Sequence, residues 1–167
     1  MSLRVVEMDI LKATENIIVH QVNCRGVMGS GLAKQIRAEW PHVYTLYKER
    51  VSDNNPESLL GQMQIIDISN DGTQFVANLF GQLDYGRDNI RYTVYSALRT
   101  SLMLLKAYAV AHGYTVAIPY QLGCGRGGGK WDDVQFMIRD VFTDHIGIVN
   151  IYKLPEKKSV WDTLLDK

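Results

Sequence analysis

The 167-residue sequence has few of the features that mark secreted, membrane or nucleic-acid-binding proteins. Its two cysteines, Cys24 and Cys124, do not have the number or spacing of a zinc site or a disulfide framework. It contains no window of 18 apolar residues and no apolar signal region, so we expect no membrane association and a cytoplasmic location. Basic and acidic residues are equal at 18 each, and Lys and Arg form no long run, which argues against binding to duplex nucleic acid.

The composition is that of a folded domain. Hydrophobic residues make up 46% and charged residues 22% of the chain, enough to bury a core without disulfides or metals. We therefore predict one domain over residues 1–167. Residues 154–167 are predicted to form a C-terminal tail or a short helix, since Ser159 and Asp162 have the spacing of a capping box.

Strand-like and helix-like segments alternate, which predicts an α/β sheet covered by helices on both faces. Residues 17–22 are continuously apolar and β-branched, so we place this strand centrally. Pro41 breaks or restarts the helix that begins near Ser30, and Gly113 ends the longest helix. The predicted strands are 3–7, 17–22, 63–68, 75–80, 115–118 and 148–152, with 63–68 and 75–80 as a hairpin, and the predicted helices are 30–40, 89–112 and 131–142.

Two glycine-rich segments each lie between a strand and a helix. The first follows residues 17–23, and the second, 123–129, follows residues 116–119. This arrangement aims backbone N–H groups and a helix dipole at an anion. Two such loops on one sheet predict a single phosphate-containing ligand held from both sides, although each loop alone is also explained by a tight strand-to-helix turn.

Other interpretations of these loops agree less well with the sequence. Gly123, Gly125 and Gly128 match a dinucleotide fingerprint, but the next strand ends at Tyr152-Lys153 without the required acid, which disfavours a nicotinamide dinucleotide oxidoreductase. A P-loop would need Ser or Thr where residue 131 is Trp. No neighbouring sequence supplies a base for either thiol, and His20 lies within an apolar strand as a core histidine would.

Three segments together resemble the macro domain family. They are Asp9-Ile10 after the first strand, VNCRGVMGSGLA at 22–33, and IPYQLGCG at 118–125 before Trp131. The resemblance implies a three-layer α/β/α fold with a central mixed sheet that binds ADP-ribose. The segment NLFGQLDYGR at 78–87 is similar to the branch that includes ADP-ribose 1''-phosphate phosphatases, some of them carried by phages.

The resemblance also implies roles for individual residues. Asp9 would accept from the adenine amino group with Ile10 beside it, Asn23 would face the distal ribose, and Tyr152 would stack on adenine. A cap Asp, a turn Asn and a core Tyr are the corresponding structural explanations. The implied first ligand loop is Gly26, Val27, Met28, Gly29, Ser30 and Gly31, and the second is Gly123, Cys124, Gly125, Arg126 and Gly127.

The sequence departs from one hydrolase branch of the family, which removes ADP-ribose from glutamate. That branch uses a lysine nucleophile after the strand corresponding to 75–80 and an aspartate in the second loop, and neither is found in 78–86 or 123–131. We expect slow hydrolysis by water, without a covalent lysine, metal or cofactor, in which Asn23 orients the ribose or the water and Gln82 and Arg87 contact a terminal phosphate.

The expected partners are ADP-ribose, ADP-ribose 1''-phosphate or ADP-ribosylated macromolecules. A non-catalytic ADP-ribose reader is the alternative from another functional class.

Overall fold

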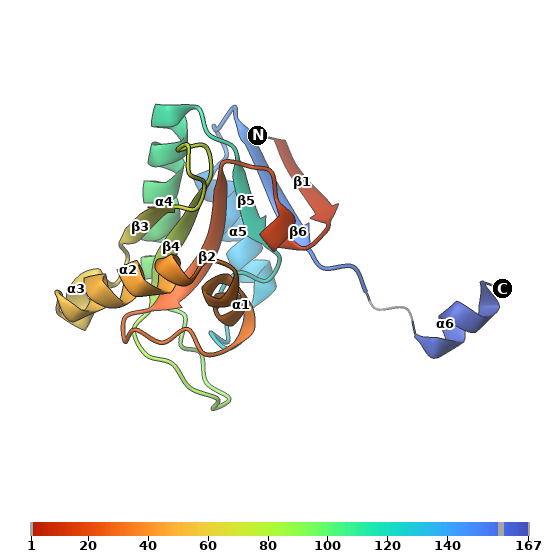
Figure 1. Ribbon diagram of the computed structural model, residues 1–167, viewed down its shortest axis with the longest axis horizontal. Coiled ribbons are helices and arrows are strands. Elements are labelled where there is room, and N and C mark those ends of the chain that lie inside the picture. The colour runs from red at the N-terminus through yellow and green to blue at the C-terminus, as the bar shows by residue number, and fades with distance from the viewer. Residues whose placement is uncertain (1, 157–158, 167) are drawn as a thin grey trace.

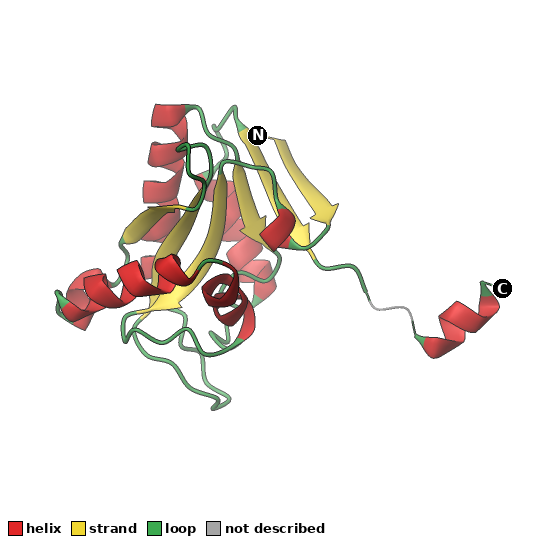
Figure 2. Ribbon diagram, viewed as in Figure 1, coloured by secondary structure: helices red, strands yellow, loops and turns green. Residues whose placement is uncertain are grey.

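The computed structural model describes residues 2–156 and 159–166, and it is built around a six-stranded sheet (Figures 1 and 2). The strands are β1 (Ser2–Glu7), β2 (Ile17–Asn23), β3 (Met63–Asp67), β4 (Phe75–Gln82), β5 (Val116–Pro119) and β6 (Ile148–Lys153). Their order across the sheet is β1-β6-β5-β2-β4-β3. All neighbouring strands are parallel except the β3–β4 hairpin. The mixed sheet and the central position of β2 confirm the predictions.

Helices cover both faces of this sheet, which confirms the predicted three-layer fold (Figure 1). The helices are η1 (Ile10–Lys12), α1 (Gly31–Glu39), α2 (Pro41–Ser52), α3 (Pro56–Leu59), α4 (Tyr95–His112), α5 (Trp131–Val141) and α6 (Val160–Leu165). α1 and α2 pack on one face, and α4 and α5 pack on the other. Pro41 restarts the helix, as predicted, because it stands at the first position of α2 where a missing N–H costs nothing.

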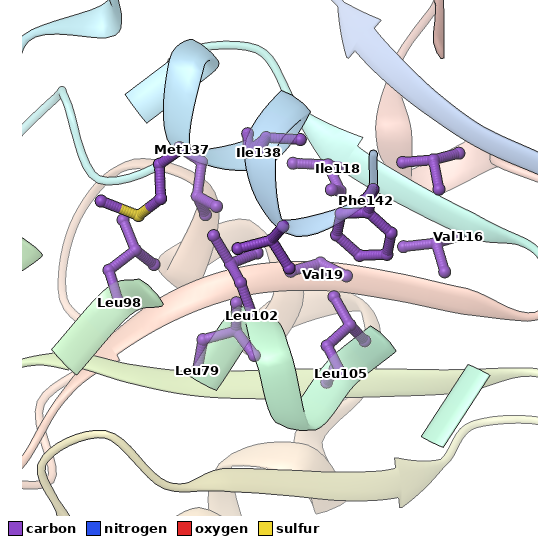
Figure 3. Close-up of a cluster of buried hydrophobic side chains, with 14 of the residues drawn as sticks. Val19, Leu79, Leu98, Leu102, Leu105, Val116, Ile118, Met137, Ile138 and Phe142 are labelled. Atoms are coloured by element: carbon purple, nitrogen blue, oxygen red, sulfur yellow. The ribbon is translucent and has the colours of Figure 1, made fainter. Parts of the chain in front are cut away.

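The larger core lies between the sheet and the pair α4 and α5 (Figure 3). Leu98, Leu102 and Leu105 are fully buried there against the sheet, as the predicted stripe requires. Full burial of such a side chain contributes about 1.5–3 kcal/mol. This packing buries one face of β2 and β5, and it therefore helps to fix where their carboxyl ends lie.

The predicted start of the longest helix at residue 89 is wrong, because α4 begins at Tyr95. Residues 89–94 instead bind neighbouring segments through their backbone. Thr93 N donates to Gly127 O at 2.9 Å and Val94 N donates to Gly81 O at 2.8 Å. These long-range hydrogen bonds hold residues 89–94 in a non-helical conformation. The hydrophobic periodicity of the sequence gives no sign of them. The predicted helix end is correct, since Gly113 is left-handed with φ +67°.

A chain of buried polar side chains crosses three strands. Gln64 donates through Nε2 to Leu46 O and accepts through Oε1 from Asn78 Nδ2 at 3.1 Å, and Asn78 Oδ1 in turn bonds His20 Nε2. His20 is only 2% exposed, which confirms it as a core histidine, and burial lowers its pKa to about 4. Because Asn78 can only accept at Oδ1, the neutral ring carries its proton on Nε2.

The C-terminal helix α6 stands apart from the rest of the structure (Figure 1). It begins with the predicted capping box, in which Ser159 Oγ accepts from Asp162 N and Asp162 accepts from Ser159 N. Its apolar side chains are exposed, Trp161 by 75%. None of the helices within residues 2–156 and 159–166 has the length and apolar character needed to cross a membrane.

Candidate ligand-binding cleft

A cleft of about 440 Å³ opens at the carboxyl ends of β2 and β5, where open α/β sheets commonly bind ligands. Its walls come from residues 20–23, 27, 29–33, 82, 85–87, 119–123 and 125–127. The two glycine-rich loops predicted from the sequence therefore face one space. The segment between β4 and α4 forms a further wall.

The first loop is organised by the side chain of Asn23. Its Oδ1 accepts from Arg25 N at 3.0 Å, Val27 N at 3.3 Å and Tyr47 Oη at 2.9 Å. Its Nδ2 donates to Val27 O at 2.8 Å. The carbonyl end is therefore occupied within the protein, and the second Nδ2–H is the group that remains for a ligand.

Tyr47, from α2, fixes the same loop from below. The ring is fully buried, and Oη accepts from Gly26 N at 3.1 Å while lying 2.7 Å from Asn23 O. Burial raises the pKa of the Tyr47 hydroxyl well above its ordinary value, so it remains a neutral donor. The loop ends at α1, whose N-cap residue Ser30 makes no side-chain capping bond. The N-terminus of α1 is thus open toward the cleft.

The second loop is held mainly by its own backbone and by the β4–α4 segment. Gly129 N donates to Gly123 O at 2.9 Å, and Gly127 O accepts from both Tyr92 N and Thr93 N. Gln121, which precedes these residues, has φ +62°, a conformation that costs a non-glycine residue about 1–3 kcal/mol. Such strain next to a ligand cleft indicates that the loop shape serves the cleft.

Hydrogen-bond donors dominate the cleft. The lining includes the guanidinium groups of Arg87 and Arg126, and none of its residues is Asp or Glu. Within residues 2–156 and 159–166, several N–H groups of the two loops donate to no protein acceptor, among them those of Gly29, Ser30, Gly31, Gly125, Arg126 and Gly127. Backbone amides, two arginines and a helix N-terminus together suit an anion with many acceptor oxygens.

Most of the predicted site residues meet in this cleft. Those that line it are Asn23, Val27, Gly29, Ser30, Gly31, Gln82, Arg87, Gly123, Gly125, Arg126 and Gly127. Six others do not line it: Asp9, Ile10, Gly26, Met28, Cys124 and Tyr152. Met28 is 1% exposed and packs in the core beneath α1, and Ile10 is 6% exposed.

The residues predicted to hold adenine have structural partners. Asp9 caps η1, with Oδ1 accepting from Leu11 N at 3.0 Å. Tyr152 is 5% exposed, and its hydroxyl donates to the Glu15 carboxylate at 2.6 Å. Glu15 also accepts from Asn150 at 2.7 Å, so the carboxylate fixes the end of β6. The predicted roles of Asp9 and Tyr152 toward adenine stay predictions.

The structure adds lining residues that sequence patterns did not indicate. Tyr120 lines the cleft, with its ring 5.0 Å from that of Trp131 and Lys153 Nζ 4.8 Å from its centroid. Tyr85 is a second aromatic in the lining and is 53% exposed. Both residues are close in the sequence to predicted site residues, and this closeness is the sequence feature that could have indicated them. Gln21 also lines the cleft. It lies in a largely apolar strand, so the sequence pattern indicated only a core strand there.

Neither thiol is prepared for nucleophilic attack. Burial raises the pKa of Cys24 and of Cys124 to about 11 each. Cys124 Sγ donates to Leu122 O at 3.3 Å. At neutral pH both groups are thiols, in agreement with the sequence-based expectation. Three His, Cys, Asp or Glu side chains do not gather as metal ligands anywhere in residues 2–156 and 159–166.

A second hollow, of about 820 Å³, lies between α4 and α5. Its charged side chains are paired with each other, Arg99 with Asp140 and Lys106 with Asp144. The remaining lining is largely small or apolar, including Met103. The hollow therefore lacks the unpaired donors that distinguish the cleft between the glycine loops.

In this fold, the loops after two strands of an α/β sheet direct their backbone amides into one cleft. This arrangement is typical of anion-binding proteins. Within that class, residues 19–138 match the family described as Macro domain. The chain belongs to the macro domain family.

Relatives with known names extend this result. The chain is 28% identical over 135 residues to a DNA ADP-ribosyl glycohydrolase of Mycobacterium tuberculosis, covering 80% of this chain and 37% of that protein. It is 33% identical over 85 residues to an ADP-ribose 1''-phosphate phosphatase of Meyerozyma guilliermondii, covering 45% of this chain and 49% of that protein. The chain thus spans half or less of the length of these relatives.

The fold is also similar to a solved structure, the macrodomain of Mycobacterium tuberculosis DarG. The TM-score is 0.78 at 25% identity, and the match covers 93% of this chain and 99% of that one.

Proposed function

We propose that the cleft binds ADP-ribose and its derivatives, with the diphosphate between the two glycine loops. The observation that carries this proposal is the concentration of donors: the loop amides that have no acceptor in the described part of the chain, and two arginines, with no Asp or Glu among the lining residues. A diphosphate offers acceptor oxygens and negative charge to such a surface. The names of the two relatives, both of which act on ADP-ribosyl compounds, support the same ligand.

The two ends of the cleft suggest the orientation of the ligand. Asp9 and Ile10 would lie toward adenine, where either Tyr152, after a rearrangement, or Tyr120, as it stands, supplies the aromatic face. The free Nδ2–H of Asn23 would donate to a distal ribose oxygen. Gln82 and Arg87 lie in the wall beyond it, where a group attached to the distal ribose would sit.

We propose hydrolysis as the leading activity, either of ADP-ribose 1''-phosphate or of an ADP-ribosyl bond. In the phosphatase reaction water adds to phosphorus, the bond from phosphorus to the 1'' oxygen breaks, and that oxygen leaves with a proton. The lining offers donors to stabilise the developing charge but no strong base, because His20 is buried with a pKa of about 4. Turnover is therefore expected to be slow.

An ADP-ribose reader without catalysis is the second proposal, and the absence of a base in the lining favours it. The discriminating experiment combines calorimetry with ADP-ribose and release of inorganic phosphate from ADP-ribose 1''-phosphate. Asn23→Asp is the control: a carboxylate keeps the acceptor for Arg25 N and Val27 N and removes the N–H offered to the ligand. It also removes the bond to Val27 O, so the fold of this variant is checked by urea denaturation. If the protein binds ADP-ribose but releases neither inorganic phosphate from ADP-ribose 1''-phosphate nor ADP-ribose from modified macromolecules, the reader proposal holds and the hydrolase proposal is refuted. No binding of ADP-ribose at millimolar concentration would refute both.

We further propose that the chain forms one macro domain followed by a tail that begins after Lys153. β1 and β6 support this extent, because they pair with each other and β6 joins β5 in the same sheet. Limited proteolysis that removes α6 and leaves ADP-ribose binding intact is the expected result.

A further inference from the structure

The side chain of Gln21 lies beneath the cleft, where three segments meet. It comes from β2, and its Nε2 donates to Gln82 Oε1 at 2.7 Å and to Thr93 Oγ1 at 2.8 Å. Gln82 ends β4, and Thr93 belongs to the segment that leads into α4. One carboxamide therefore connects the central strand with the wall formed by residues 82–93.

Glycines surround this carboxamide closely. A Cβ at Gly81 would lie 2.2 Å from Gln21 Oε1, one at Gly123 would lie 2.9 Å from the same atom, and one at Gly127 would lie 3.0 Å from Nε2. A side chain at either of the first two positions would therefore force the Gln21 amide to move. The amide of Gln21 thus lies close to the backbone of both Gly81 and Gly123.

The hydrogen bonds also fix which way the amide points. Thr93 Oγ1 uses its single proton to donate to Gly123 O at 2.7 Å, so toward Gln21 it can only accept. Gln82 Nε2 donates to Asp84 O at 2.7 Å, which leaves Oε1 to face Gln21. Gln21 must therefore present its NH₂ group to both partners. Its own Oε1 is buried and accepts from no group within the described part of the chain.

We propose that Gln21 is a positioning residue that sets the direction of the Gln82 carboxamide. By holding Gln82 Oε1 away from the ligand, it leaves the second Nε2–H of Gln82 as the group presented to the cleft. A donor at this point, beside Arg87, selects a ligand that carries acceptor oxygens there, such as a phosphate on the distal ribose. The choice of ligand rests on the proposed function, whereas the direction of Gln82 does not.

The test is a double-mutant cycle on Gln21→Met and Gln82→Met, measured as the ratio of affinities for ADP-ribose 1''-phosphate and ADP-ribose before phosphate is released. Each single change is expected to lower this ratio about fivefold to tenfold, and the double change no further than either alone. The matched control is Gln74→Met, which also loses two donated hydrogen bonds, to Ala13 O and Glu15 O, and should leave the ratio unchanged.

Thr93 gives a second route if Gln21→Met does not fold. Thr93→Val removes the hydroxyl that Gln21 and Gly123 share and should lower the ratio, and Thr93→Ser, which keeps it, should restore the ratio. A wild-type ratio in folded Gln21→Met that still binds ADP-ribose overturns the proposed role, as would additive effects in the cycle.

A readout without ligand separates this inference from the proposed function. In amide NMR spectra the Gln82 Nε2–H that is donated to Asp84 O should exchange slowly in the wild type and at least tenfold faster in Gln21→Met, where the carboxamide is free to turn. Unchanged exchange would overturn the positioning role even if ADP-ribose binds. Failure of the wild type to bind ADP-ribose, with the exchange effect present, would refute only the function.

Discussion

The two glycine loops look alike in sequence but are held in place differently. In the first loop a Cβ at Gly31 would meet nothing within 4 Å, and one at Gly29 would make only an ordinary 3.7 Å contact. In the second loop a Cβ would lie 2.4 Å from Thr93 Oγ1 at Gly127 and 2.8 Å from Gly123 O at Gly129. The first loop is therefore fixed by side chains, and the second by close backbone packing.

This difference separates two reasons for a glycine. Gly127 and Gly129 are needed by the protein itself, whatever the ligand. Gly125, in the same loop, faces open space and has no positive φ, whereas Gly31 in the first loop faces open space but has φ +57°, which by itself favours glycine. Only at an open position without a positive φ, such as Gly125, does glycine point to close approach of a ligand.

The largest expected effect is on stability, from Gly127→Ala. The added methyl group would overlap Thr93 Oγ1 and Gly123 O, and we expect a loss of about 2–3 kcal/mol in the free energy of unfolding. Urea denaturation measures it. Gly29→Ala, in the first loop, serves as control and should change stability by less than about 0.5 kcal/mol. If both variants lose the same free energy of unfolding, the two loops do not differ in how closely their glycines are packed.

The two cysteines, one beside each loop, provide the next contrast. With a pKa of about 11 instead of 9.0, each carries about a hundredfold less thiolate at pH 8 than an ordinary cysteine. Alkylation of Cys124 should be slower by that factor and should rise about tenfold per unit of pH up to pH 11. Cys24 is fully buried and should react more slowly still. Mass spectrometry after timed labelling checks this, and labelling of Cys124 at the rate of free cysteine would contradict it.

Gly125→Ala should separate binding from stability. The stability should stay within about 0.5 kcal/mol of the wild type, because the methyl group would enter open space. The affinity for ADP-ribose should fall roughly tenfold, as expected when one hydrogen bond to a charged group is lost. Calorimetry and urea denaturation of the same sample measure both. Undiminished affinity would remove this position from the phosphate contacts.

The smallest effect is expected from Tyr47→Phe, which removes the hydroxyl that fixes the first loop. We expect a loss of about 1 kcal/mol, with faster hydrogen exchange in residues 24–30 and unchanged exchange in residues 123–129. Tyr114→Phe is the control, since that hydroxyl makes no hydrogen bond within residues 2–156 and 159–166. Faster exchange in both loops would mean that they are not held independently.

Much of the fold could be predicted because it follows local periodicity. The stripe of Leu98, Leu102 and Leu105 indicated both a helix and its buried face. The start of the same helix could not be predicted, because Thr93 N and Val94 N bond to Gly127 and Gly81, which are distant in the sequence. Interactions of that kind leave no periodic pattern.

The site shows the same division. Glycine spacing and family motifs located both loops, since the backbone there follows from residue type. The family resemblance implied that Asn23 faces the distal ribose, but not that its acceptor is occupied by Arg25, Val27 and Tyr47. The role of Gln21 depends on the direction of four hydrogen bonds, and no single-residue preference encodes such a direction.

The polar chain from His20 through Asn78 to Gln64 also constrains strand pairing. Asn78 stands directly opposite His20 in the parallel pair β2–β4 and directly opposite Gln64 in the antiparallel pair β3–β4. A slip of one residue in either pair would turn the slipped strand's polar group to the other face and leave its partners unbonded in an apolar layer. The apolar stretches of β2 and β4 would otherwise tolerate several alignments. Three buried polar residues thus select one register for three strands, and with it the position of the first loop, after β2, and of the cleft wall that follows β4.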